Sequence, residues 1–144
     1  MSRQRANRVL LVEDEAVMAL VTEQNVIAAG YEVVGIAHSE ARALELLVSD
    51  RPNLAVVDVR LAPGDGVRVA RALLDHGCAV VFATAHCDDL ERTWTDPQTL
   101  CLQKPYNAAN VPRALDLLTG ALTGAPWPDP LPPGMRLVPA TAGV

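Results

Sequence analysis

The sequence predicts an α/β protein, built as an open, doubly wound parallel sheet of five strands with helices on both faces. Two observations lead to this class. Short β-branched runs alternate with Ala/Leu/Arg segments of helical period, which is the pattern of βαβ units. Half of the residues are hydrophobic but only 3% are aromatic, and a core of Val, Leu, Ala and Ile suits buried parallel strands. At 144 residues the chain has the length of one such domain.

The first half of the chain alternates strand and helix signals. "RVLLVE" (8–13) is expected to form the first strand, and "AVMALVTEQNVIAA" (16–29) the first helix, which a glycine ends. "EVVGIA" (32–37) has the composition of a second strand. Ser39 is a suitable N-cap for a second helix that extends to about Ser49.

The same alternation continues toward the C-terminus. "NLAVVDV" (53–59) is expected to be the third strand, and "GDG" (64–66) opens a helix that runs to about His76. "AVVFAT" (79–84) and "TLCLQ" (99–103) have the apolar, β-branched character of the fourth and fifth strands.

The segment between the fourth and fifth strands is short for a helical crossover. Only 20 residues separate Thr84 from Lys104, and Pro97 interrupts them, so we expect a stunted or irregular fourth helix. The last helix is expected from about Asn107 to Leu122.

The chain is expected to divide into a domain, residues 1–123, and a proline-rich tail, residues 124–144, with no separate effector domain. The tail holds six of the eleven prolines, so it cannot form a helix or a central strand and is expected to be extended. Apolar residues such as Trp127 indicate that it packs on the domain or on a second copy of the chain, and a disordered tail is the alternative.

Composition narrows the class of protein further. A formal net charge of −5 argues against nucleic acid as a direct partner. No apolar stretch has the length of a signal peptide or a membrane span. The three cysteines are odd in number and lack CxxC spacing, so a disulfide framework or zinc site is not expected and a reducing cytoplasm fits best. Cys78 is expected in the core, whereas Cys87 is a candidate for an exposed thiol.

Polar residues gather where the predicted strands end. Glu13 and Asp14 follow the first strand, Asp58 ends the third, Thr84 the fourth and Lys104 the fifth. In open parallel sheets, chemistry gathers at the carboxyl ends of the strands. Converging carboxylates are suited to a hard divalent cation such as Mg²⁺, whose charge offsets their mutual repulsion.

This group of residues predicts phosphoryl transfer. Asp58 stands alone at a strand end beside a flexible loop and is the preferred nucleophile, which would form an aspartyl phosphate. The Lys104 ammonium and the Thr84 hydroxyl would stabilise the charge on the transferring group, and Glu13 and Asp14 would hold the metal.

Four motifs occur in order on the predicted strands: "ED" after "VLLV", "AVVDVRL" followed by "GDG", "FATA", and "QKPY". Over about residues 8–122 the sequence resembles the receiver domain of two-component response regulators. The resemblance implies a flavodoxin-like sheet and a stand-alone bacterial receiver in which Asp58 accepts phosphate from a sensor histidine kinase or a phosphotransfer protein. It also implies a Mg²⁺ site made by Glu13, Asp14, Asp58 and the backbone carbonyl of Arg60, and a cis Lys104–Pro105 bond.

By the same resemblance the protein is not an enzyme beyond possible self-catalysed phosphorylation and dephosphorylation. Its output would pass through contact with a downstream protein partner, with a homodimer possible, and not through direct contact with nucleic acid or a membrane.

Several alternatives stay open. Taken singly, the acids suit ordinary loop or capping residues, Thr84 a strand former and Lys104 a surface lysine. Receivers usually carry an aromatic where Cys101 stands here, so a non-switching interaction module is one rival. An aspartate-nucleophile phosphatase is another, but it needs an acid at the position of Arg60. A Walker-type nucleotide enzyme is excluded because GxxxxGK[ST] is missing.

Overall fold

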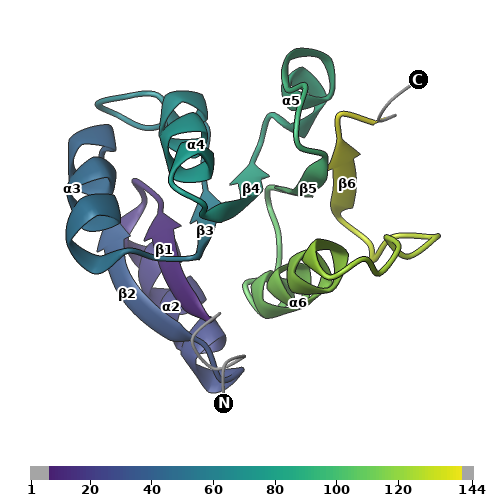
Figure 1. The fold of residues 1–144 in the computed structure, drawn as a ribbon, viewed down its shortest axis with the longest axis horizontal. Coiled ribbons are helices and arrows are strands. Elements are labelled where there is room, and N and C mark those ends of the chain that lie inside the picture. The colour runs from purple at the N-terminus through teal and green to yellow at the C-terminus, as the bar shows by residue number, and fades with distance from the viewer. Residues whose placement is uncertain (1–6, 141–144) are drawn as a thin grey trace.

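The computed structural model describes residues 7–140, which fold into one sheet with helices on both faces (Figure 1). The strands are β1 (Arg8–Val12), β2 (Glu32–Ala37), β3 (Leu54–Val57), β4 (Ala79–Thr84), β5 (Thr99–Gln103) and β6 (Met135–Val138). The helices are α2 (Ala16–Ala28), α3 (Glu40–Asp50), α4 (Gly66–Asp75), α5 (Cys87–Thr93) and α6 (Asn110–Leu122).

The strand order is β2-β1-β3-β4-β5-β6, and the first five strands are parallel. The α/β class and the parallel core of the sheet are therefore as the sequence predicts, but the sheet has six strands instead of five. Strand order reverses between β1 and β3, because the chain goes out from β1 to β2 and then returns past β1. Such a reversal opens a crevice at the carboxyl ends of the two strands.

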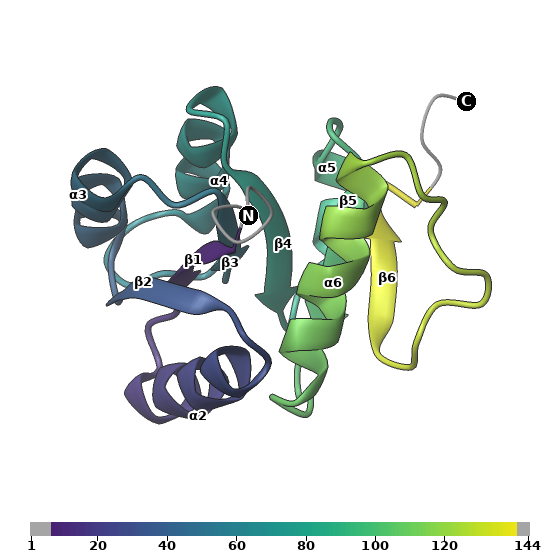
Figure 2. The ribbon, with the colours of Figure 1, turned by 60° about the horizontal axis from the view of Figure 1, so that its bottom comes forward.

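Two helical layers cover the sheet. Helices α3, α4 and α5 lie on one face, and α2 and α6 lie on the other (Figures 1 and 2). Alternation along each strand explains this, since Leu10 and Val12 of β1 face the first layer, while Val9 and Leu11 face the second. No helix among residues 7–140 is long and apolar enough to cross a lipid bilayer.

The extra strand comes from the segment expected to be an extended tail. Strand β6 pairs antiparallel with β5, with Thr99 opposite Val138 and Leu102 opposite Met135. Both Met135 and Val138 are buried. An edge position tolerates the prolines on either side of the strand, because only one side of β6 has to supply ladder hydrogen bonds. Figure 2 shows β6 beside α6 at the outer edge of the sheet.

The fourth crossover helix is short, as the sequence predicts: α5 has seven residues. It is held by Leu90 and by Trp94, the residue that follows it, and both are buried. The Trp94 ring packs edge-to-face on Phe82 at 4.9 Å between centroids, and the Arg71 guanidinium lies 4.0 Å from its centre.

The structure corrects the expectation for the cysteines. Cys87 and Cys101 form a disulfide, and Cys87 is fully buried instead of exposed. The bond forms because α5 packs on β5, which brings two Cα atoms separated by 14 residues to 5.9 Å. The spacing argument for a reducing compartment is therefore removed. Cys78 is a buried free thiol, as expected.

Candidate functional site

The acidic residues converge at the carboxyl ends of β1 and β3. Glu13 directly follows β1, and Asp58 directly follows β3. The backbone N–H of Asp58 donates to the Val12 carbonyl at 3.0 Å, which continues the ladder between the two strands for one more residue. Carboxylate oxygens of Glu13, Asp14 and Asp58 all lie within 4.8 Å of one another. Glu13 and Asp58 are buried, and Asp14 is more open to solvent.

Lys104 directly follows β5 and reaches across the end of β4 to this cluster. Its ammonium lies 2.8 Å from Asp58 Oδ2, 3.0 Å from Glu13 Oε1 and 3.1 Å from Glu15 Oε1. It is the only lysine in the sequence. The Lys104–Pro105 bond is cis. The structure therefore brings the predicted nucleophile and the predicted cation into direct contact.

Burial and charge act in opposite directions at this site. Burial alone would lower the pKa of Lys104, but hydrogen bonds and charge attraction from Asp58 and Glu13 outweigh it, and the pKa is raised above 10.5. For Glu13, burial is the largest effect and raises the pKa above 4.5, although hydrogen bonds from Lys104 and from the backbone of Glu15 partly offset it. The cluster thus holds its lysine charged, whereas ionisation of Glu13 is disfavoured.

Thr84 and Arg60 line the same cavity as Asp58 and Lys104, a hollow of about 320 Å³. Thr84 is fully buried, and its Oγ1 accepts a hydrogen bond from the His86 backbone N–H at 3.3 Å. The Arg60 backbone N–H donates to Asp58 Oδ1 at 3.0 Å. All the residues predicted for the site therefore meet at one place, and the roles assigned to them remain proposals.

The donor set suits Mg²⁺. That ion takes oxygen ligands and retains waters, and the three carboxylates offer oxygens from one buried wall and one open wall. The Lys104 ammonium already balances part of this negative charge. Glu13, Asp14 and Asp58 fit a hard divalent cation better than a soft one, because no sulfur or imidazole ligand belongs to the cluster that the described residues form.

Two contributors were not singled out from the sequence. Glu15 binds Lys104 from the solvent side, and its signal is the third carboxylate of "EDE". Gly66 packs so closely on the Asp58 loop that an added Cβ would lie 2.0 Å from the Asp58 carbonyl oxygen and 2.5 Å from Val59 Cα. Only a glycine allows this approach.

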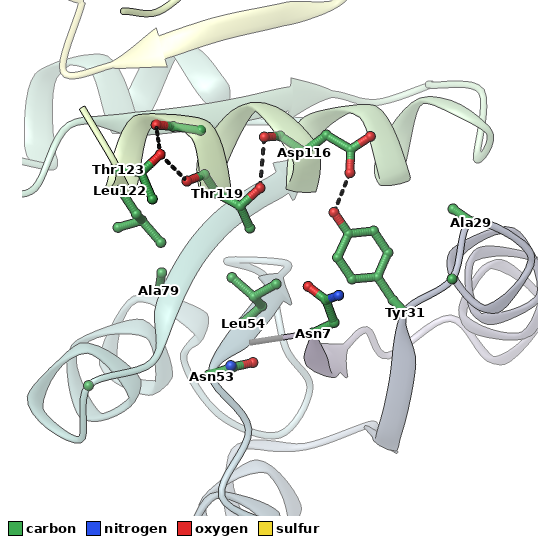
Figure 3. A pocket seen from close by; sticks show the side chains of 13 residues that line it. Asn7, Ala29, Tyr31, Asn53, Leu54, Ala79, Asp116, Thr119, Leu122 and Thr123 are labelled. Carbon is green, nitrogen blue, oxygen red and sulfur yellow. Dashed lines mark hydrogen bonds between the residues drawn. The ribbon is translucent and has the colours of Figure 1, made fainter. Parts of the chain in front are cut away.

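A larger cavity of about 720 Å³ lies at the opposite end of the sheet (Figure 3). It is lined by the turns before β2 and β4 and by the end of α6. Its polar contact is a hydrogen bond from the Tyr31 hydroxyl to Asp116, and burial raises the pKa of Tyr31. Asp116 is the only carboxylate in its lining, so the acidic chemistry of the described residues belongs to the smaller hollow.

Comparison with known proteins identifies the family. Residues 9–116 match the response regulator receiver domain. The chain is 30% identical over 113 residues to the transcriptional regulatory protein PdtaR of Mycobacterium tuberculosis, a match covering 76% of this chain and 55% of that protein. It is 30% identical over 109 residues to the phyllosphere-induced regulator PhyR of Methylorubrum extorquens, covering 74% and 41%. The chain thus spans about half the length of the curated relatives it matches.

Solved structures agree with this match. The receiver domain of PhyR from Erythrobacter litoralis superposes with a TM-score of 0.71 at 26% identity, over 85% of this chain and 94% of that one. A response regulator receiver protein from Sinorhizobium medicae gives a TM-score of 0.69 at 29% identity, over 79% and 94%. Because the family match covers most of the chain and the fold and acidic cluster agree with it, this protein belongs to the response regulator receiver domain family.

Proposed function

We propose that this chain is a phosphorylation-controlled receiver in which Asp58 accepts a phosphoryl group from a sensor histidine kinase or a phosphotransfer protein. The observation that carries the proposal is the 2.8 Å contact between the Lys104 ammonium and Asp58 Oδ2 inside the acidic cluster. An Asp58 oxygen attacks the phosphorus, the bond from phosphorus to the donor's histidine nitrogen breaks, and an acyl phosphate forms.

The residues of the site each have a part in this transfer. Glu13, Asp14, Asp58 and the Arg60 carbonyl would hold Mg²⁺, which when bound supplies positive charge to the phosphoryl oxygens. Lys104 stays charged because of its acidic neighbours and can pair with the new phosphoryl group. Thr84 can turn its hydroxyl from the His86 backbone N–H toward the same oxygens.

We infer that the output is contact with another protein. All the helices and strands of residues 7–140 belong to one sheet and its two layers. PhyR of Bartonella quintana, an anti-anti-sigma factor by description, has a receiver similar to this chain, with a TM-score of 0.72 at 26% identity. That similarity supports a protein as the downstream partner. The proposal places the chain in the bacterial cytoplasm, where the ATP that a kinase uses is found.

Incubation with Mg²⁺ and acetyl phosphate, followed by intact-mass measurement, tests the proposal. We expect the wild type to gain one phosphate and Asp58→Asn to gain none. Asp75→Asn is the matched control, because Asp75 is an exposed aspartate at the end of α4, and it should gain phosphate as the wild type does. Phosphate on Asp58→Asn, or none on the wild type, would contradict the assignment.

A second measurement separates the switch from its rivals. Phosphorylation that leaves oligomeric state and partner affinity unchanged would favour a non-switching module. Turnover of free phosphate esters would favour a phosphatase. Arg60 argues against the latter, because it is an exposed cation at the place where the phosphatase needs an acid.

A further inference from the structure

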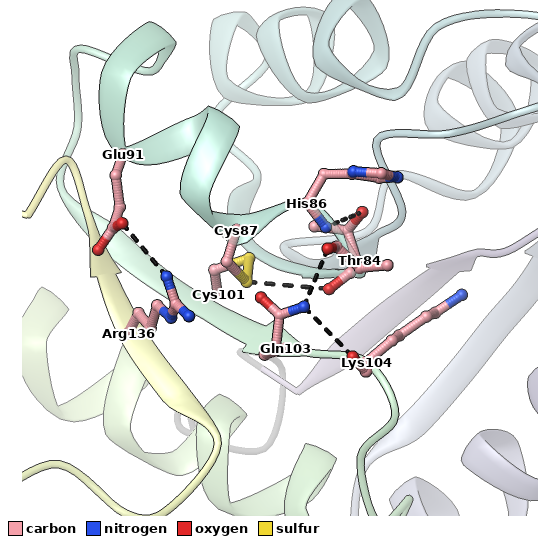
Figure 4. Close-up of a disulfide and its surroundings, with 9 residues drawn as sticks. Thr84, His86, Cys87, Glu91, Cys101, Gln103, Lys104 and Arg136 are labelled. Atoms are coloured by element: carbon pink, nitrogen blue, oxygen red, sulfur yellow. Dashed lines mark hydrogen bonds and ion pairs between the residues drawn. A yellow bond between two sulfur atoms is a disulfide. The ribbon is translucent and has the colours of Figure 1, made fainter.

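The disulfide joins the beginning of α5 to the middle of β5 (Figure 4). Cys87 is the first residue of α5, and Cys101 is the central residue of β5. Both are completely buried. The sequence contains one other cysteine, Cys78, which is a free thiol. The bond therefore closes a loop that contains the whole of α5 and the irregular segment after it.

This cross-link lies beside the proposed phosphorylation site. Cys87 is three residues after Thr84, and Cys101 is three residues before Lys104. The Cys87 sulfur lies 3.9 Å from the Thr84 carbonyl oxygen, which also accepts a hydrogen bond from the Lys104 backbone N–H at 2.9 Å. One carbonyl group thus contacts the disulfide on one side and the backbone of the site lysine on the other (Figure 4).

The helix has other anchors that do not depend on the bond. Leu90 and Trp94 are buried in the core beneath it. The Trp94 indole N–H donates to the Pro97 carbonyl at 2.7 Å, and Glu91 forms an ion pair of 3.3 Å with Arg136 of β6. These anchors act on the later turns of α5, whereas the disulfide acts on its first residue. Breaking the bond should therefore loosen the segment after Thr84 without unfolding the helix.

We propose that Cys87 and Cys101 form a reversible thiol–disulfide modification site that controls the mobility of the segment after Thr84 and thereby the phosphorylation of Asp58. The second part rests on the proposed function. Reduction breaks the Sγ–Sγ bond with two electrons from a dithiol, whose two protons pass to the Cys87 and Cys101 thiols while the dithiol becomes a disulfide. Oxidation is the reverse exchange with a disulfide oxidant.

The direction of the effect follows from the geometry. In the oxidised protein, β5 holds the segment after Thr84 in place, and this opposes any shift of Thr84 toward a phosphoryl group on Asp58. In the reduced protein only the later turns of α5 remain anchored. The reduced form should therefore accept phosphate faster.

The test uses the full chain, prepared with a dithiol or with oxidised glutathione. Maleimide labelling after denaturation should find three thiols in the reduced protein and one, Cys78, in the oxidised protein. Hydrogen exchange at residues 85–94 should be faster after reduction. With acetyl phosphate and Mg²⁺, the oxidised protein should gain phosphate at least about fivefold more slowly, the lower end of typical coupling between sites.

Variants supply the controls. Cys101→Ser should behave like the reduced wild type even in oxidant, and Cys78→Ser should keep the full response, because burial raises the pKa of Cys78 to about 12 and leaves it unreactive. If Cys101→Ser fails to fold, the comparison of reduced and oxidised wild type still decides the question, because it needs no substitution.

The outcomes distinguish this proposal from the one on which it rests. Three labelled thiols after oxidation, or identical hydrogen exchange in both forms, would overturn the redox site. Equal phosphorylation rates would overturn its control of Asp58. A protein that takes no phosphate in either form contradicts the proposed function, and hydrogen exchange then decides the cross-link alone.

Discussion

Lys104 Nζ lies 2.8 Å from Asp58 Oδ2, and this contact joins the ends of two strands that are not neighbours in the sheet. Strand β4, which ends in Thr84, runs between them. The only lysine of the chain therefore reaches over Thr84 to bind the acid. The side chains of Lys104 and Asp58 are 15% and 6% exposed, so each is the main charge partner that the other has in a nearly dry setting.

Replacement of Lys104 by methionine should destabilise the metal-free protein. The change keeps the length of the side chain but leaves Asp58 and Glu13 buried without their cation. We expect a loss of about 3 kcal/mol, the lower end for a buried pair broken from one side, because the cavity admits water. Urea unfolding measures it. Added Mg²⁺ should restore part of the loss, and a loss that Mg²⁺ does not change would contradict the metal site.

Alkaline pH should weaken the fold through the same lysine. The pKa of folded Lys104 is raised above 10.5, so its stabilising effect is complete below pH 10.5 and is lost as the pH rises through the folded value. The stability difference between wild type and Lys104→Met should therefore be constant up to pH 10.5 and shrink above it. Because the chain has one lysine, a ¹³Cε-lysine label gives a single NMR signal that reports the titration directly.

Glu13→Gln should stabilise the metal-free protein and weaken its Mg²⁺ binding. Burial raises the pKa of folded Glu13 above 4.5, so the favourable protonated state is lost as the pH rises through that value, and the ionised side chain is disfavoured at neutral pH. Glutamine removes the charge and keeps the oxygen that accepts from the Glu15 backbone.

Two measurements check this variant. Urea unfolding without metal should show Glu13→Gln to be more stable than the wild type at neutral pH, with the difference vanishing below pH 4.5. Calorimetric titration should show Mg²⁺ affinity falling by at least about tenfold. Unchanged affinity would remove Glu13 from the metal site.

Gly66→Ala should disturb the nucleophile although residue 66 touches no ligand. The new Cβ would overlap the Asp58 carbonyl oxygen at 2.0 Å, and backbone atoms cannot move aside as a side chain can. We expect a loss of about 2–3 kcal/mol in unfolding free energy from overpacking, together with slower phosphorylation. Gly120→Ala is the matched control in α6, because its Cβ would meet only Ala125 at 3.6 Å, and it should gain up to about 1 kcal/mol from helix propensity.

Val138→Asp should show whether β6 belongs to the folded unit. Val138 is fully buried opposite Thr99, so an unpaired carboxylate there should reduce the unfolding free energy by about 3 kcal/mol. Arg136→Ala alters the exposed face of the same strand and should change it by less than about 1 kcal/mol. Equal, small effects would mean that the segment is not held on β5.

The candidate site is predictable from local patterns for a physical reason. Parallel strands present their carboxyl ends at one edge, so Glu13, Asp58, Thr84 and Lys104 must meet once their strands are recognised. Each strand is an apolar run that ends at a polar residue, and both features can be read without knowing any long-range contact. The close packing of Gly66 on Asp58 is different, because it depends on the path of the loop between them.

The tail and the disulfide depend on where separate segments pack. The proline content correctly excludes a helix or a central strand, but pairing of β6 requires the free edge of β5, which no local pattern reveals. Cys87 and Cys101 are 14 residues apart without a recognised spacing, and they meet only because a short helix lies flat on β5.

Composition and period are enough to determine the α/β class and the edge of the sheet where the charges gather, because side-chain alternation and strand ends are local properties. The sixth strand, the sulfur cross-link and the contact of Lys104 with three acids arise from long-range packing. Their energies depend on distance and burial between residues far apart in the chain, and only the folded arrangement specifies those quantities.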